Sequence, residues 1–215
     1  MNLGWHLAGT EQAFHNALTL ALATRRISSP FHYVEVGVGD GLTLEAVHQW
    51  LLEREVDHTI DAVDIPGYDG KLVAPRSSLP ESRVSWSITL SKTGSIGFFP
   101  GIRQKFDFVF IDACHGWPCV TNDFLMAEAS VRVGGIVCFH DTDPECQGLH
   151  FQHHCQMGIS ARKAVSELGL LDDTRSFWKK VDETTGDKSC QGHGALFVQR
   201  QLLETNDPKQ SPSLH

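Results

Sequence analysis

Acidic and imidazole side chains follow two apolar runs in the second half of the chain. The run FDFVFID ends in Asp112, with His115 shortly beyond it, and the run IVCFHD ends in His140 and Asp141. A buried strand delivers the residue at its carboxyl end to the edge of a sheet, where ligands bind in open α/β folds. Imidazole titrates near neutrality, so His115 or His140 is a candidate general base that removes a proton from a substrate hydroxyl. For His115 the alternative is a hydrogen bond that caps the loop.

A glycine-rich turn lies in the stretch YVEVGVGDG, residues 33–41. The apolar, β-branched residues before it predict a buried strand, and TLEAVHQWLL after it predicts a helix. Glycines at such a junction allow a tight turn and let a ligand approach the backbone at the helix N-terminus. The spacing from Gly37 through Gly39 to Gly41 is G-x-G-x-G, and Leu42 stands where a dinucleotide fingerprint has its third glycine. The alternative is a tight turn that binds no ligand.

The next two predicted strands each end near a polar side chain. HTIDAVDI ends at Asp64, whose place beside the first turn suits a carboxylate that accepts hydrogen bonds from both hydroxyls of a ribose. The alternative for Asp64 is a solvated residue before the turn at Pro66 and Gly67. VSWSITL predicts a third strand by its alternation, and Ser91 follows it where an adenine edge would lie.

The remaining elements complete an alternation of strands and helices. Thr10 is the predicted N-cap of a leading helix that ends at Arg26. Gly134 and Gly135 are predicted to turn the chain from a helix into the fifth strand. The other predicted elements are a short broken helix over 95–102, helices over 118–133 and 160–171, and strands over 175–183 and 193–200. Such an order is typical of a doubly wound α/β domain.

Two motifs together resemble those of a known family. Glu35, Gly37, Gly39 and Gly41 match E/D-x-G-x-G-x-G, motif I of class I S-adenosylmethionine-dependent methyltransferases. The succession FDFVFIDxxH, helix, GGIVxFHD resembles the branch that includes catechol-type, macrocin-type and cephalosporin-pathway O-methyltransferases. The resemblance covers about residues 33–141. It implies a Rossmann-like, mostly parallel seven-stranded sheet with an antiparallel last strand.

The resemblance also implies a cofactor and a set of site residues. In the family the glycine turn wraps the methionine part of S-adenosylmethionine. The implied cofactor-binding residues are Glu35, Gly37, Gly39, Gly41, Asp64, Ser91 and Asp112. The implied catalytic residues are Asp112, His115 and His140. The expected reaction is transfer of the sulfonium methyl to a hydroxyl of a small molecule, with the protein supplying proximity and orientation.

Several related enzymes hold a divalent cation between an acid after the fourth strand and an acid pair after the fifth. Asp112 and Asp141 match two of these positions, and His140 stands where the other carboxylate or amide would be. Carboxylates and waters suit Mg²⁺, whereas an imidazole shifts the preference toward softer metals. The metal set implied is therefore Asp112, His140 and Asp141. In the metal-free alternative Asp112 orders a loop and Asp141 hydrogen-bonds backbone or substrate.

Length and composition limit the classes of protein. We expect residues 1–201 to form a single domain, with an N-terminal helical cover over 1–30 and a lid or substrate loop over 142–158. The tail over 202–215 is polar and is expected to be disordered. The formal net charge of -8 argues against a nucleic-acid partner, and no apolar run reaches membrane length. The start does not resemble a signal peptide and the six cysteines are scattered, so a cytoplasmic location is expected; the oligomeric state is left open.

Three other functions remain open at this point. An NAD-dependent oxidoreductase is disfavoured by the G-x-G-x-G spacing. An N-methyltransferase or a protein methyltransferase would share every motif named above. A catalytically silent module that keeps the cofactor fold would do so as well.

Overall fold

A computed structural model of the chain describes residues 10–25, 29–39, 41–65, 83–90, 92–143, 155–185 and 194–202. The strands in this part are β1 (Phe31–Val36), β2 (His58–Asp64), β3 (Val84–Leu90), β4 (Phe106–Ile111), β5 (Val131–His140), β6 (Trp178–Thr184) and β7 (Ala195–Arg200). The helices are α1 (Glu11–Ala23), α2 (Leu42–Leu52), α3 (Ser95–Phe98), α4 (Trp117–Ala127) and α5 (Cys155–Glu167).

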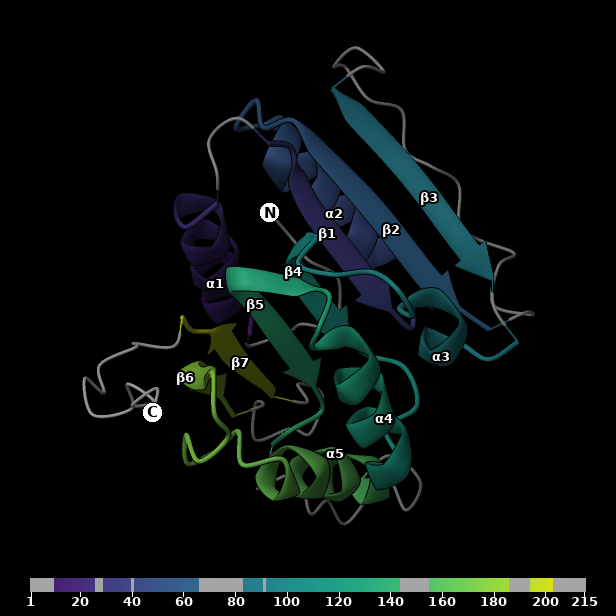
Figure 1. Ribbon diagram of the computed structural model, residues 1–215, viewed down its shortest axis with the longest axis vertical. Helices are drawn as coiled ribbons and strands as arrows, with labels where there is room; N and C mark the ends of the chain where they lie inside the picture. Colours follow the sequence, from purple (N-terminus) through teal and green to yellow (C-terminus); the bar gives the residue numbers. More distant parts are fainter. Residues whose placement is uncertain are drawn as a thin grey trace, which may run out of the picture.

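The strands form one sheet in the order β3-β2-β1-β4-β5-β7-β6 (Figure 1). The pairs from β3 through β5 are parallel, and β7 runs antiparallel to both of its neighbours, β5 and β6. The predicted fold class, a mostly parallel sheet with an antiparallel last strand, is confirmed.

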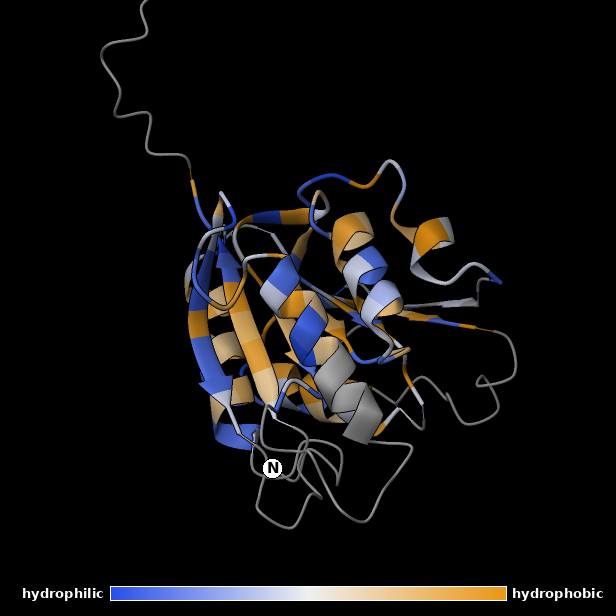
Figure 2. Ribbon diagram, turned by 90° about the horizontal axis from the view of Figure 1, so that it is seen from below, coloured by the Kyte–Doolittle hydropathy of each residue, from blue (hydrophilic) through white to orange (hydrophobic). Residues whose placement is uncertain are grey.

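Two hydrophobic clusters cover the two faces of the sheet. On one face α1 and α2 pack against residues such as Tyr33, Phe108 and Phe110. On the other face α4 and α5 pack against residues such as Val109 and Phe139. Neighbouring residues of β4 therefore point to opposite clusters, as the period of two in a strand requires. Figure 2 shows hydrophobic residues, in orange, on strands of the sheet and on the helices beside it. The result is a doubly wound, three-layered domain.

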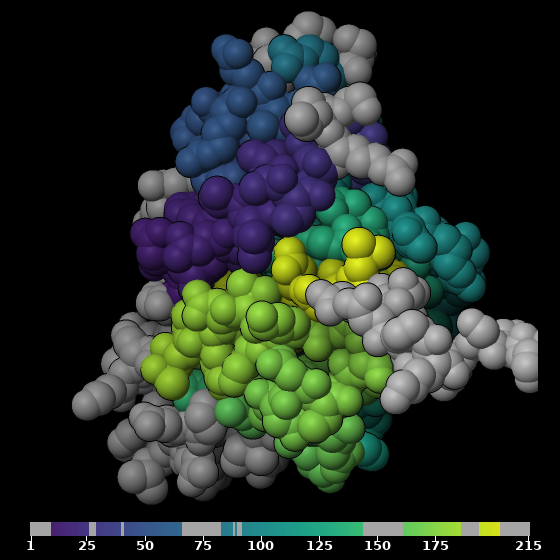
Figure 3. Space-filling model, turned by 60° about the vertical axis from the view of Figure 1, so that its left-hand side comes forward, coloured from purple at the N-terminus to yellow at the C-terminus, as the bar shows by residue number. Residues whose placement is uncertain are grey.

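Helix α1 is held to the sheet by a buried aromatic side chain. The ring of Phe14 has no exposed surface, and its centroid lies 5.3 Å from that of Phe108, 5.4 Å from that of Phe110 and 6.2 Å from that of Phe197. In the space-filling view the purple surface of α1 lies above the green surface of the C-terminal segment (Figure 3). Helix α1 therefore packs against the sheet and forms part of the hydrophobic core.

The end of α4 and the start of β5 differ from the prediction. A helix was expected over 118–133, but α4 ends at Ala127 and β5 already begins at Val131. The side chain of Arg132 fixes this start, since it bonds the carboxylate of Asp107 and the carbonyl oxygens of residues in and after α1. The register between β4 and β5 shifts at this point.

The glycine pair was expected to precede the fifth strand and instead lies inside it. Gly134 has φ +80°, and a Cβ on Gly135 would lie 2.9 Å from the carbonyl oxygen of Phe106. Only glycine allows this approach of the two strands, so the pair forms the irregularity of β5.

Smaller differences concern element ends. The leading helix ends at Ala23 rather than Arg26, and Thr10, at the predicted N-cap, makes no side-chain capping bond. Helix α5 starts at Cys155, inside the predicted lid over 142–158, of which residues 144–154 lie outside the described part. The predicted tail from residue 203 onward, the start of the chain up to residue 9 and Ser91 lie outside it too.

Within the described part, no helix is both long and apolar enough to cross a bilayer.

Candidate functional site

The strand order reverses direction between β1 and β4, and the loops after these strands meet there. The amide of Asp112, after β4, donates to the carbonyl of Val36 in β1 at 2.9 Å, and the amide of Gly37 donates to the carbonyl of Val63 in β2 at 2.8 Å. In open α/β sheets this switch point, outside the carboxyl ends of the strands, is where ligands bind.

Gly37 holds the two loops together. Its φ is +83°, and a Cβ at this position would lie 2.3 Å from the Cα of Ala113 and 2.4 Å from the carbonyl oxygen of Asp112. The space beside Gly37 is thus filled by the neighbouring loop, so this glycine has a packing role that the sequence motif does not reveal.

Gly39, in contrast to Gly37, faces open space. Its φ is +55°, and within the described residues no atom lies within 4 Å of the position that a Cβ would take. Gly41 follows in a left-handed conformation as the N-cap residue of α2, which has no side-chain cap. The turn therefore leaves room for a ligand at Gly39, next to the N-terminus of a helix.

Asp64, the predicted ribose ligand, lies against this turn. Its Oδ2 accepts hydrogen bonds from the amides of Val38 at 2.8 Å and Gly39 at 3.4 Å, and its Oδ1 accepts one from Ile65 at 2.7 Å. The carboxylate fixes the backbone of the glycine turn, a role that was not predicted. Oδ1 accepts one hydrogen bond and retains a second lone pair, so contact with a ribose hydroxyl stays a prediction.

Glu35 lies beneath the turn and is 2% exposed. Its Oε2 accepts a hydrogen bond of 2.9 Å from the hydroxyl of Tyr33, two residues earlier on the same face of β1. Burial and the neighbouring Glu35 raise the pKa of Tyr33 well above its ordinary value, which keeps the phenol protonated as a donor. The partnership was not predicted, although the i, i+2 spacing on a strand signals a shared face.

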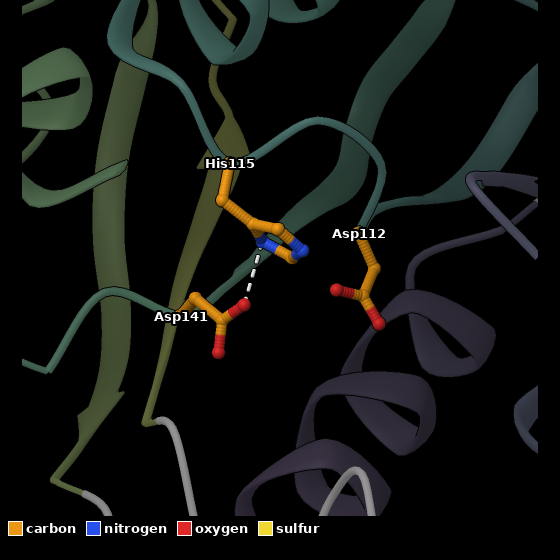
Figure 4. Close-up of side chains that lie close together, drawn as sticks. All are labelled: Asp112, His115 and Asp141. Carbon is orange, nitrogen blue, oxygen red and sulfur yellow. Dashed lines mark ion pairs between the residues drawn. The ribbon is translucent and has the colours of Figure 1, made fainter. Parts of the chain in front are cut away.

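Asp112, His115 and Asp141 come together at the carboxyl ends of β4 and β5. One possible ligand atom from each residue lies within 4.8 Å of those of the other two. Nδ1 of His115 is 2.6 Å from Oδ2 of Asp141. Figure 4 shows the imidazole between the two carboxylates. The structure thus brings these three residues together at one edge of the sheet.

The environment of His115 favours its protonated form. Burial of the imidazole lowers its pKa, but the hydrogen bond with Asp141 and the negative charges of Asp141 and Asp112 outweigh burial, and the pKa of His115 is raised. Because Nδ1 faces a carboxylate, it carries the proton in the neutral ring and Nε2 has the lone pair. An imidazole held in this way can accept a proton through Nε2.

His140 lies beside the same carboxylates but more deeply. Its side chain is 2% exposed, and its Nδ1 lies 3.0 Å from Oδ1 of Asp112 and 3.5 Å from Oδ1 of Asp141. Asp141 itself has φ +58°, a left-handed conformation that is uncommon for a non-glycine residue. The arrangement suits His140 for orienting Asp112, whereas His115 is closer to the surface.

The donor set fits a divalent cation. Two carboxylates and an imidazole within mutual reach are the ligands of Mn²⁺, Zn²⁺ and related ions, and they leave positions for water or substrate. The predicted set contained His140 as the third ligand; the cluster formed by the structure contains His115 in that place.

Comparisons with known proteins identify the family of the chain. Residues 34–142 match the family model described as a methyltransferase domain. No curated protein matches the sequence at a significant level.

Solved structures share the fold at low identity. A protein from Corynebacterium glutamicum has a TM-score of 0.57 at 15% identity, covering 90% of this chain and 82% of its own. The O-methyltransferase from Bacillus cereus, in complex with S-adenosylhomocysteine (SAH), has a TM-score of 0.56 at 15% identity, covering 93% and 85%. The SAH-bound methyltransferase PaMTH1 from Podospora anserina has a TM-score of 0.57 at 14% identity, covering 89% and 78%.

The resemblance seen in the sequence is thereby confirmed for the family. With the glycine turn at the switch point and the family model spanning half of its residues, the chain belongs to the methyltransferase domain family and has the Rossmann-like fold of class I S-adenosylmethionine-dependent methyltransferases.

Proposed function

We propose that this enzyme transfers the methyl group of S-adenosylmethionine to a hydroxyl oxygen of a small molecule. One observation carries the proposal: the open space at Gly39 lies on the same sheet edge as the cluster of Asp112, His115 and Asp141. A bound cofactor supplies a methyl group that is already activated on a sulfonium. The structural neighbour from Bacillus cereus is an O-methyltransferase in complex with SAH, which supports this choice of reaction.

In this proposal, different residues bind the cofactor and the acceptor. The turn at Gly39 and the carboxylate of Asp64 would receive the methionine and ribose parts of the cofactor. The cluster would receive the acceptor hydroxyl, with Asp141 holding Nδ1 of His115 and Nε2 of His115 accepting the hydroxyl proton. His140 would hold Asp112 in position. Proximity and orientation of oxygen and methyl then provide most of the acceleration.

The same cluster would hold a divalent cation through Asp112, His115 and Asp141. Such an ion would act as a Lewis acid that lowers the pKa of the acceptor hydroxyl. If His115 ligates the ion, it does not serve as the base, so the two roles are alternatives that a metal titration separates.

The acceptor and the location belong to the same proposal. The net charge of -8 favours a small-molecule acceptor over nucleic acid, and we place the enzyme in the cytoplasm without a membrane partner.

The test begins with calorimetric titration of the protein with SAH, in Mg²⁺, in Mn²⁺ and in EDTA. Saturable binding at micromolar concentrations supports the cofactor, and no binding in any buffer refutes the proposal. SAH production is then measured with phenols, sugars and amines as acceptors. Turnover of phenols or sugars alone supports a hydroxyl acceptor, and turnover of amines alone refutes it. Loss of turnover in EDTA, restored by one of the cations, assigns the metal role to the cluster.

A further inference from the structure

Two cysteines flank the histidine of the site, and their thiols lie together. Cys114 directly precedes His115 in the loop after β4, and Cys119 lies in the first turn of α4. A Cβ on Gly116 would lie 3.5 Å from Sγ of Cys114 and 3.8 Å from Sγ of Cys119, so both sulfurs adjoin one point. A hydrogen bond with the side chain of Cys114, together with burial, raises the pKa of Cys119 to about 11.

The pair is accessible from solvent. Cys114 is exposed and Cys119 half-buried, whereas Cys138, the other cysteine whose side chain is described, is fully buried in β5. Reactive cysteines are typically exposed and have a resolving cysteine beside them. Cys114 is exposed, as a reactive cysteine is, and Cys119 lies beside it, where a resolving cysteine would be.

We propose that Cys114 and Cys119 form a reversible disulfide that displaces His115 and switches the site off. The effect on methyl transfer rests on the proposed function; the formation of the disulfide does not. The oxidant is a small-molecule disulfide such as oxidised glutathione. The thiolate of Cys114 attacks one of its sulfurs and releases one equivalent of thiol. Cys119 then loses its proton, attacks Sγ of Cys114 and releases the second. Two protein thiols are oxidised and one disulfide is reduced.

The bond draws the loop toward the helix. A disulfide brings its sulfurs to about 2.05 Å, well inside the contact distance of two thiols. The start of α4 is anchored to α5, because Nε1 of Trp117 donates to the carboxylate of Glu167 at 2.7 Å. The residue that moves is therefore Cys114, and His115 next to it is drawn away from Asp141. Losing a positioned base lowers the rate by about 10²-fold or more.

The chemical step can be read from one peptide. Trypsin cleavage after Lys105 and Arg132 releases residues 106–132, which contain both cysteines and no other. The full-length protein is incubated with oxidised glutathione and digested without reductant, and the peptide masses are measured by mass spectrometry. The proposal expects this fragment two hydrogens lighter, and its original mass after dithiothreitol. A fragment that stays reduced, or that carries only glutathione, overturns the proposal.

The effect on the site is measured on the same samples. Histidine ring signals in NMR spectra are recorded before and after oxidation, and the signal of His115 is assigned by its loss in His115→Asn. The proposal expects the His115 signal to shift and methyl transfer to fall about 10²-fold, both reversed by dithiothreitol. Cys119→Ser cannot form the disulfide. After treatment with oxidised glutathione and removal of any glutathione adduct, this variant should keep its His115 signal and its rate of methyl transfer unchanged. A disulfide that leaves the His115 signal and the activity unchanged overturns the switch. Failure of the proposed function appears separately, as reduced protein that binds no SAH while the peptide mass and the NMR shift still report on the disulfide.

Discussion

Gly37 and Gly39 belong to one motif, yet alanine at these two positions should have opposite consequences. At Gly37 a Cβ would lie 2.3 Å from the Cα of Ala113, which is backbone and cannot rotate away. At Gly39 the Cβ would meet no atom within 4 Å in the part of the chain that the structure describes. Gly37→Ala is therefore expected to destabilise the fold, whereas Gly39→Ala is expected to obstruct the proposed cofactor site.

The magnitudes follow from the two environments. Both positions have positive φ, +83° and +55°, and a left-handed conformation costs an ordinary residue about 1–2 kcal/mol. Only Gly37→Ala adds overpacking, which costs about 1–3 kcal/mol or more where the neighbour is rigid. We expect the free energy of unfolding to fall by about 2–5 kcal/mol for Gly37→Ala and by about 1–2 kcal/mol for Gly39→Ala.

The assay is urea denaturation of both variants, followed by calorimetric titration with SAH. Gly39→Ala should weaken SAH binding at least tenfold while remaining folded, and Gly39→Val, with a larger side chain, should abolish binding. Equal losses of unfolding free energy in the two alanine variants would refute the assignment of Gly37 to packing. Normal SAH affinity in Gly39→Val would refute the cofactor role of the turn.

Three further predictions concern the site, the pH dependence and the core. Asp141→Ala should reduce methyl transfer by about 10²-fold or more while SAH affinity stays within a few-fold, because Asp141 contacts His115 rather than the glycine turn; unchanged turnover would remove Asp141 from the site. Burial, with a smaller effect of the neighbouring His58, lowers the pKa of His48 to about 4, so the unfolded state binds more protons between pH 4 and 6.5. Unfolding free energy should fall by up to about 3 kcal/mol as the pH drops through that window. In His48→Leu the unfolding free energy, measured by urea denaturation at several pH values, should depend less on pH there, and an equal dependence in that variant would contradict the assignment. Phe14→Ala should lower the unfolding free energy by about 3–5 kcal/mol, since the ring is fully buried among three others; a loss below 1 kcal/mol in urea would show that α1 contributes little to the core.

The elements near the glycine turn could be predicted because local pattern and tertiary environment agree there. The strand before Gly37 and the strand that ends at Asp64 are buried apolar runs, and both form where expected. The start of β5 could not be predicted, because VRV is compatible with the end of a helix. Its strand conformation depends on Arg132 reaching Asp107, a contact between residues far apart in the sequence.

Within the site, residue types were easier to predict than their partners. Asp112, His115 and Asp141 were identified from strand ends, but sequence alone does not show that His115 rather than His140 completes the cluster. That outcome depends on the path of the loop after β4, which brings Nδ1 of His115 to Asp141. The packing role of Gly37 and the contact between Cys114 and Cys119 also depend on this loop.

During synthesis the first three strands leave the ribosome well before β4. They carry the glycine turn and Asp64, and because β1, β2 and β3 are neighbours in the sheet they can pair at once. The backbone that packs against Gly37, however, belongs to residues 112 and 113, at the far side of β1. A nascent chain that stops at β3 thus has an exposed β1 edge and an unsupported turn. Insertion of β4 beside β1 supports the glycine turn, and the cluster is complete only when β5 adds Asp141 to Asp112 and His115.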